Sequence, residues 1–179
     1  MADELIDLLD EKGNTIGTIM KSEAHKTGAW HKAAGTFIYN PKRGILLQLR
    51  HKDKEICPDM WDISCSGHVG AGEDVREAAW REIEEEIGLK IPPDKLEYLF
   101  TELTRIKTND FISNEFGNIF LAYTDAEIEE LNLQEEEVAD ARYFSLDEFE
   151  LMVERKDGNV VPHWGMYKKV IQHIRKNLD

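Results

Sequence analysis

Three glutamates grouped on one predicted helix are the residues whose spacing best suggests chemistry. Glu82, Glu85 and Glu86 stand at positions i, i+3 and i+4, so their carboxylates project from the same helical face. Like charges at this spacing destabilise a solvated helix by roughly a few tenths of a kcal/mol per pair. A cation that prefers oxygen ligands, such as Mg²⁺ or Mn²⁺, would offset this repulsion, and Mg²⁺ is commonly shared between carboxylates and substrate phosphate. The spacing therefore favours metal-dependent diphosphate chemistry.

The glutamates belong to a longer motif. Residues 67–89 read GHVGAGEDVREAAWREIEEEIGL and fit the pattern G-x5-E-x7-R-E-U-x-E-E-x-G-U, where U is an aliphatic residue, at every fixed position. The matching residues are Gly67, Glu73, Arg81, Glu82, Ile83, Glu85, Glu86, Gly88 and Leu89. This segment resembles the box for which the Nudix hydrolase family is named, and the resemblance extends in strand order over most of the chain.

The residues around the glutamates are predicted to shape the metal site. Residues 67–72 contain three glycines, which let the backbone turn tightly and approach the carboxylates. Arg81 is predicted to pair with Glu73 or Glu85 and to fix its orientation. The resemblance implies that Glu82 and Glu86 are the principal metal ligands, that Glu85 assists, and that one of these glutamates helps to activate the attacking water; which one remains open. It implies a metal site of Glu82, Glu86, Glu85 and Gly67, and a catalytic set of Glu85, Glu82, Glu86, Arg81 and Glu73.

Two further stretches resemble type I isopentenyl-diphosphate isomerase, a relative within the Nudix family. They are residues 8–33 (LLDEKGNTIGTIMKSEAHKTGAWHKA) and residues 61–68 (WDISCSGH). In that family three histidines and two glutamates bind a metal, and a cysteine and one of the glutamates carry proton transfer. The resemblance matches the histidines to His25, His31 and His68, and the catalytic glutamate to Glu115. These four residues are a possible second metal or substrate site.

Two isomerase positions differ in this chain. Ser113 stands where the first ligand glutamate is expected, and Ser66 stands where the catalytic cysteine is expected. Cys65 is adjacent, but successive side chains of a strand point to opposite faces, so Cys65 is predicted to face away from the site. A serine hydroxyl is a much weaker acid than a thiol. We therefore expect an isomerase-like scaffold that performs hydrolysis.

The leading hypothesis is a hydrolase dependent on Mg²⁺ or Mn²⁺ that cleaves the diphosphate linkage of a nucleoside diphosphate derivative or a similar X-P-P-Y substrate. Isomerisation of isoprenoid diphosphates and a non-catalytic Nudix-like binding domain are the alternatives. Arg50 is a possible phosphate contact, or else an exposed charge at a strand end. Loops 52–59 and 108–115 are predicted to set specificity, and the sequence does not identify X or Y. The acidic run 135–137 is expected to be a solvated surface.

The elements that must position these residues follow from hydrophobic periodicity and turn residues. A β-hairpin is predicted at 4–10 and 15–21, with a short helical turn at 22–26. Further strands are predicted at 32–39, 45–50, 61–66, 96–107, 116–123 and 138–144, and helical segments at 74–87, 125–131, 146–155 and 162–177. This order predicts an α/β (α+β) fold, in which a mixed sheet is covered by helices on both faces. We expect a single domain over residues 1–179.

Composition limits the possible partners. The chain has 22 Lys and Arg against 36 Asp and Glu, a formal net charge of −14, so little positive surface is available for duplex nucleic acid. No apolar run approaches the length of a transmembrane helix, and no secretory signal is visible, so we expect no membrane partner and a cytoplasmic location. Cys57 and Cys65 are too few for a disulfide scaffold. A monomer or a homodimer is expected, with a small-molecule diphosphate as the partner.

Overall fold

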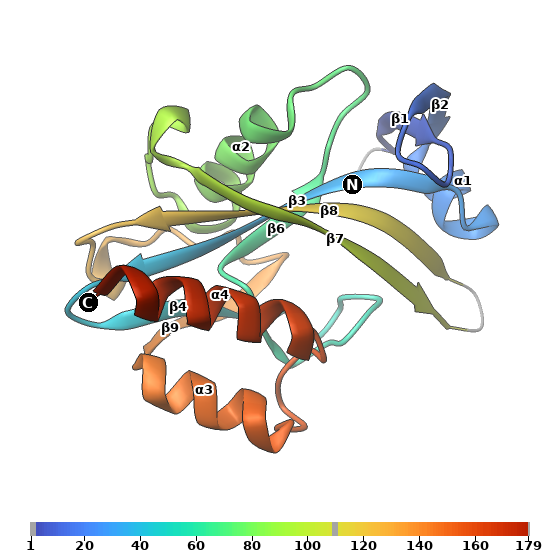
Figure 1. The fold of residues 1–179 in the computed structure, drawn as a ribbon. Coiled ribbons are helices and arrows are strands. Elements are labelled where there is room, and N and C mark those ends of the chain that lie inside the picture. The colour runs from blue at the N-terminus through green and yellow to red at the C-terminus, as the bar shows by residue number, and fades with distance from the viewer. Residues whose placement is uncertain (1–2, 109–110, 179) are drawn as a thin grey trace.

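The computed structural model describes residues 3–108 and 111–178, which form a nine-stranded mixed sheet and four α-helices (Figure 1). The strands are β1 (Leu5–Leu9), β2 (Thr15–Met20), β3 (Trp30–Asn40), β4 (Gly44–Arg50), β5 (Trp61–Asp62), β6 (Cys65–His68), β7 (Glu97–Lys107), β8 (Ile112–Tyr123) and β9 (Val138–Phe144). The helices are α1 (Lys21–Thr27), α2 (Val75–Ile87), α3 (Leu146–Arg155) and α4 (Trp164–Leu178), with short 3-10 turns η1 (Pro93–Lys95) and η2 (Ile128–Glu130).

Strand β3 is the centre of the sheet. It runs parallel to β8 over ten residue pairs and antiparallel to β6 and β4 on its other side. Leu9 of β1 pairs with Trp30, the first residue of β3. Strand β2 pairs with β1 and completes the predicted N-terminal hairpin. Strand β7 pairs with β8, and β9 pairs with β4. Every strand that carries a candidate site residue is therefore β3 or a direct neighbour of β3.

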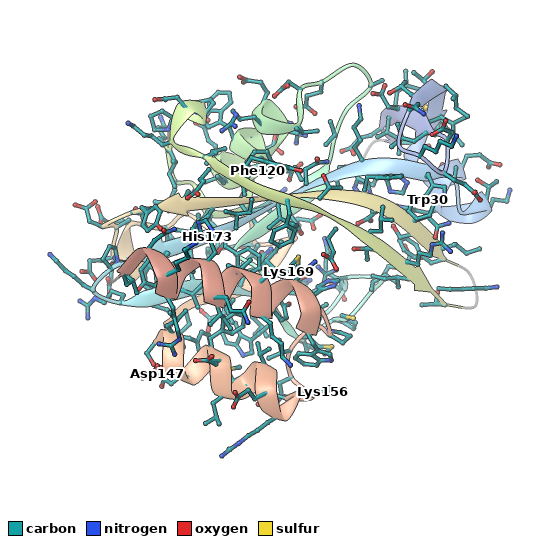
Figure 2. The ribbon with its side chains drawn as sticks, in the orientation of Figure 1. Trp30, Phe120, Asp147, Lys156, Lys169 and His173 are labelled. Carbon is teal, nitrogen blue, oxygen red and sulfur yellow. The ribbon has the colours of Figure 1, made fainter. Side chains whose placement is uncertain are left out.

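Helices cover both faces of the sheet, as the sequence predicts. Figure 1 shows α2 on one face and α3 with α4 on the other. Each face of the sheet has its own hydrophobic core, and adjacent residues of β4 belong to different cores. Leu46 packs with the α2 residues, and Leu47 packs with the residues of α3 and α4. Figure 2 shows Lys169 and His173 on α4, on the side of β7, where they pair with Glu102 (2.6 Å) and Glu97 (3.0 Å).

Helix α2, which carries the glutamates, begins and ends as its sequence requires. The Asp74 side chain caps its N-terminus by accepting a hydrogen bond from the amide of Arg76 (2.8 Å), so the cap does not use the Glu77 partner of a capping box. At its C-terminus, Gly88 takes the left-handed conformation (φ +73°), which glycine adopts without steric cost. Ala79, Ile83 and Ile87 are buried against the sheet, so the helix can rotate little about its axis.

Three predicted boundaries were wrong. Strand β8 begins at Ile112 instead of residue 116, so the predicted loop 108–115 is shorter; residues 109 and 110 lie outside the described part of the chain. The predicted strand 61–66 is two strands, because the Ser64 hydroxyl, which accepts from the Ile38 amide (2.8 Å) and donates to the Leu46 carbonyl (2.6 Å), interrupts the ladder. The predicted helical segment 125–131 is only the 3-10 turn η2.

No helix within residues 3–108 and 111–178 is long and apolar enough to cross a membrane.

The two-sided core makes a stability prediction. Leu46→Ala and Leu47→Ala should each lower the free energy of unfolding by about 2–5 kcal/mol, because each removes a fully buried side chain from a different face of one strand. Leu103→Ala is the control, because that side chain on β7 is 57% exposed, and it should change stability by less than about 0.5 kcal/mol. Urea unfolding measures all three. A small effect of either β4 substitution would contradict the helix layer on that face.

Candidate active site

A single cavity of about 490 Å³ contains most of the candidate residues. The three box glutamates of α2 line it, together with Ser66, Gly67 and His68 of β6, Ser113 and Glu115 of β8, and His25 of α1. Loop 51–60, between β4 and β5, forms another part of the wall through residues 53–57. Both loops that were predicted to set specificity therefore contribute residues to the cavity. The predicted loop 108–115 does so through Phe111, Ser113 and Glu115.

Glu86 is the most deeply buried of the box glutamates that line the cavity, with 5% of the residue exposed. One of its oxygens accepts hydrogen bonds from the Ser66 amide (2.9 Å) and from Nε2 of Gln48 (3.1 Å). Burial raises the pKa of Glu86 to about 8, and the neighbouring charge of Glu82 adds to the rise. Burial also raises the pKa of Glu82, although Arg81 opposes it. Two buried carboxylates that repel each other would both be stabilised by a bound cation.

The backbone of the cavity comes close to these carboxylates at Gly67. A Cβ atom placed on Gly67 would collide with the carboxylate of Glu82, so no other residue type fits here without moving that side chain. The motif requires glycine at position 67 because the backbone there lies close to the Glu82 carboxylate. Its backbone torsion is not the reason, because φ of Gly67 lies outside the left-handed region.

Arg81 holds three of the box glutamates in place. Its Nε and Nη2 donate to the two oxygens of Glu73 (3.1 and 3.2 Å), and Nη1 donates to Glu82 (2.6 Å) and Glu85 (3.1 Å). Nη2 also donates to the carbonyl of His68 (3.0 Å). Arg81 therefore contacts both partners that the sequence predicts, and it fixes the end of the glycine loop relative to helix α2.

Three histidines and Glu115 form a second polar cluster. The sheet register places His31 opposite Glu115 and Ala33 opposite His68, so these side chains share one face of the sheet, and His25 reaches them from α1. One ligand atom from each of the four residues lies within 4.8 Å of the others. Nε2 of His25 and Nε2 of His68 are 3.1 Å apart, and Nε2 of His31 is 3.7 Å from the Glu115 carboxylate.

The protonation state of this cluster suits a metal ion. Nδ1 of His31 lies 2.9 Å from the Ala29 carbonyl, and Nε2 is buried without a hydrogen-bond partner, 3.7 Å from the Glu115 carboxylate. Burial lowers the pKa of His25 to about 4 and that of His68 to about 3. Burial alone would raise the pKa of Glu115, but His31, His68 and the Ser113 hydroxyl (2.5 Å) lower it to about 2.

Cys65 does not reach the cavity. It is 1% exposed and packs in the core beneath α2, where burial raises the pKa of its thiol well above the usual value. Strand β6 pairs with β3 in unbroken register, so no bulge turns Cys65 around, and Ser66 is the residue that lines the cavity. The predicted orientation of Cys65 is confirmed.

Arg50 lines the cavity but is already engaged. Its Nη1 donates to Asp62 (3.1 Å) and its Nε donates to the carbonyl of Ile56 (3.0 Å), and the side chain is 15% exposed. Asp62 also accepts a hydrogen bond from the Tyr167 hydroxyl (3.3 Å). Arg50 is therefore not an exposed charge at a strand end; it anchors loop 51–60 at the cavity wall.

Among the residues that sequence reasoning missed, one belongs to the cavity wall and one contacts Glu86 from outside the cavity. Glu137 was expected to be solvated with the rest of run 135–137, but it is 8% exposed, lines the cavity and pairs with Lys54. Nothing in the run distinguishes Glu137 from its neighbours. Gln48 was missed as well, although a polar residue within the apolar run GILLQLR of β4 was an available signal.

The contacts of Arg81 generate a prediction. Arg81→Lys keeps the charge, but three donors on one nitrogen cannot replace the four hydrogen bonds that the guanidinium makes to Glu73, Glu82 and Glu85. Mn²⁺ affinity measured by electron paramagnetic resonance should therefore fall about 10-fold to 100-fold. Arg155→Lys, at an exposed position of α3, is the control and should leave the affinity unchanged. Equal affinity in Arg81→Lys and the unsubstituted protein would show that the Arg81 guanidinium does not orient the carboxylates.

Comparison with known proteins agrees with this geometry. The chain is 36% identical to Nudix hydrolase 3 of Arabidopsis thaliana, in a match that covers 100% of this chain but only 24% of that longer protein. It is 33% identical to an isopentenyl-diphosphate Delta-isomerase of Pectobacterium atrosepticum, over 79% of this chain and 76% of that protein. The solved structure of DR0079 from Deinococcus radiodurans has the same fold, with a TM-score of 0.69 at 20% identity over 93% of this chain and 98% of that one. The family profile described as NUDIX domain matches residues 29–164, and the chain therefore belongs to the Nudix hydrolase family.

Proposed function

We propose that this protein is a divalent-metal-dependent hydrolase that cleaves the diphosphate linkage of an X-P-P-Y substrate. The observation that carries the proposal is that Glu86, which is buried, and Glu82, which is partly buried, both have raised pKa values and both line a cavity large enough for a small molecule. An all-oxygen donor set of this kind fits Mg²⁺ or Mn²⁺. When bound, such a metal screens phosphate charge and lowers the pKa of water.

The residues of the box would divide the work. Glu82 and Glu86 would hold the cation, and the Ser66 amide and Gln48 would keep the Glu86 carboxylate aimed at it. Glu85 is half exposed at the cavity and would assist in binding the cation. Glu73 would keep Arg81 in position, and Arg81 in turn would keep Glu82 and Glu85 in position. The attacking water would lose its proton to one of the box glutamates.

Cationic side chains of the cavity would receive the substrate phosphates. Lys54 stands close enough to Glu86 for its charge to oppose the rise in the pKa of that carboxyl, and it pairs with Glu137 in the absence of substrate. We propose that Lys54 exchanges this partner for a substrate phosphate. Arg50, held by Asp62, would supply fixed positive charge at the same wall.

The second polar cluster supports a second metal position. His25, His31, His68 and Glu115 offer three nitrogens and one oxygen, a donor set that suits Zn²⁺ or Mn²⁺ better than Mg²⁺. The unpartnered Nε2 of His31 supports this assignment, because a buried ring nitrogen without a partner is otherwise unfavourable.

We propose a small-molecule diphosphate as the partner, a single domain over residues 1–179, and a cytoplasmic location.

Replacement of the buried glutamates tests the hydrolase proposal. Glu86→Gln and Glu82→Gln should each lower kcat/KM at least about 100-fold with a nucleoside diphosphate or nucleotide-sugar substrate in Mg²⁺, a loss of about 2.7 kcal/mol of transition-state stabilisation. The metal-free Glu86→Gln protein should unfold at the same or a higher temperature, because the carboxyl it replaces is unfavourably buried in its charged form. Chromatography of the nucleoside monophosphate product measures the first effect, and thermal unfolding measures the second.

Glu84→Gln is the matched control, since Glu84 lies on the exposed face of α2, 4.0 Å from Lys90. It should retain activity within about twofold. Full turnover in either buried-site variant would contradict the proposed metal site. Absence of turnover by the unsubstituted protein across diphosphates with both metals would favour a non-catalytic binding domain.

A second candidate function is the isomerisation of isoprenoid diphosphates, which is favoured by the gathering of three histidines with Glu115. Against it, the cavity presents the hydroxyl of Ser66, while the Cys65 thiol is buried on the other face. Incubation with isopentenyl diphosphate and Mn²⁺ should therefore yield no allylic product by mass spectrometry and chromatography. Allylic product without phosphate release would overturn the choice of hydrolysis.

A further inference from the structure

The glycine loop of the active site is held from outside by strand β1. The amide of Ala71 donates to the carbonyl of Leu5 (2.9 Å), Ile6 forms a β-bridge with Gly70, and the amide of Gly72 donates to the carboxylate of Asp7 (3.1 Å). These three contacts come from residues that precede the segment 29–164 matched by the family profile. The N-terminal hairpin is therefore in direct contact with the loop that leads into helix α2.

Asp7 is built into this contact as a charged residue. The residue is 6% exposed, and besides Gly72 it accepts hydrogen bonds from Nζ of Lys32 (3.0 Å) and from the Thr15 hydroxyl (3.4 Å). Burial would raise the pKa of Asp7, but the hydrogen bonds from Lys32 and Gly72 outweigh it, so that the pKa lies below its usual value. The carbonyl of Lys32 also accepts from the Val69 amide (3.2 Å), so Lys32 holds both Asp7 and the loop.

The loop transmits its position to the carboxylates. The amide of Gly70 donates to the Glu73 carboxylate (2.7 Å), and Glu73 accepts both arms of the Arg81 guanidinium. Arg81 donates in turn to Glu82 and Glu85. A continuous series of hydrogen bonds thus runs from the hairpin through the loop to the proposed metal ligands. Gly72 lies in the left-handed region (φ +74°), so the turn that its amide contact fixes is not one that a typical residue adopts.

We propose that Asp7 is a positioning residue of the active site, which acts on the metal-binding carboxylates through the amide of Gly72 and the Glu73–Arg81 pair. This inference rests on the proposed function, because it assigns Asp7 a role in the same metal site. Asp7 touches neither the cavity nor the carboxylates of α2, so its effect is exerted only through the loop. Strand β1, through Asp7, then helps to position the active-site loop and is more than a cover for the sheet edge.

The test compares Asp7→Ala, Asp7→Asn and Glu11→Gln. Asp7→Ala removes the acceptor for Gly72, whereas Asp7→Asn keeps an oxygen for Gly72 and loses the ion pair with Lys32. Glu11→Gln is the matched control, an exposed acidic residue in the turn of the same hairpin. The readouts are Mn²⁺ affinity, kcat and KM, and hydrogen exchange of the amides of residues 70–73 in the metal-free protein, all below the melting temperature of each variant.

We expect Asp7→Ala to weaken Mn²⁺ binding about 10-fold, to lower kcat more than it raises KM, and to speed exchange of the Gly72 amide at least about 10-fold. Asp7→Asn should recover most of the lost affinity and protection, and Glu11→Gln should match the unsubstituted protein. A purely structural role predicts a lower melting temperature with unchanged Mn²⁺ affinity, and that result would overturn the inference. If Asp7→Ala does not fold, hydrogen exchange in the unsubstituted protein decides the question: a Gly72 amide that exchanges as fast as an amide of an unfolded chain would show that Asp7 does not hold it, and would overturn the inference.

The two proposals fail separately. If the unsubstituted protein hydrolyses no diphosphate, the proposed function is wrong, yet the exchange of residues 70–73 still decides whether Asp7 fixes the loop. If the unsubstituted protein is an active hydrolase and Asp7→Ala matches it in affinity, kcat and exchange, the function stands and the role of Asp7 is wrong.

Discussion

The register of strand β3 against β6 and β8 is the constraint on which the site depends. Because side chains alternate between faces, a slip of one residue would carry a whole set of them to the opposite face of the sheet. In the observed register His31 stands opposite Glu115 and Ala33 stands opposite His68, so the polar cluster assembles on one face. The same register turns Cys65 and Ala34 toward the apolar core beneath α2. The polar cluster and one of the two cores are therefore consequences of one pairing pattern.

Burial of negative charge is the second constraint, and it acts on the α2 side. The chain carries a formal charge of −14, yet most of its acidic residues are solvated and therefore tolerate their charge. The glutamates of α2 differ because Ile83 and Ile87 are buried in the core and fix the orientation of the helix, so that Glu82, Glu85 and Glu86 line the cavity. Arg81 compensates Glu73, Glu82 and Glu85, and Glu86 is left with only neutral donors. Burial therefore raises the pKa of Glu86, with the charge of Lys54 opposing the rise, and the fold gains little stability from this carboxyl in its charged form.

The sequence predicts the elements and the box well, because both depend on local patterns. The period of the apolar residues locates α2, and the fixed spacing of the motif identifies Glu82, Glu85 and Glu86 within it. Long-range features escape this reasoning. The burial of Glu137 depends on Lys54, which lies 83 positions away in the chain, and the capture of Arg50 depends on Asp62 and Tyr167. The contact of Asp7 with Gly72 has no sequence signature either, since an acidic residue in an alternating strand is ordinarily solvated.

Hydrolysis and isomerisation of a diphosphate place different demands on the side chains of one cavity. Hydrolysis needs carboxylates that hold a cation beside the substrate phosphate, and the complete set on α2 lines the cavity. Isomerisation needs an acid near the hydrocarbon part of the substrate, and the position that could supply it holds Ser66, whose hydroxyl is a poor proton donor. Ser113, in place of a ligand glutamate, donates to Glu115 and so orients the carboxylate that remains. The histidine cluster can thus keep a cation site without the thiol of an isomerase, which is compatible with the proposed hydrolysis.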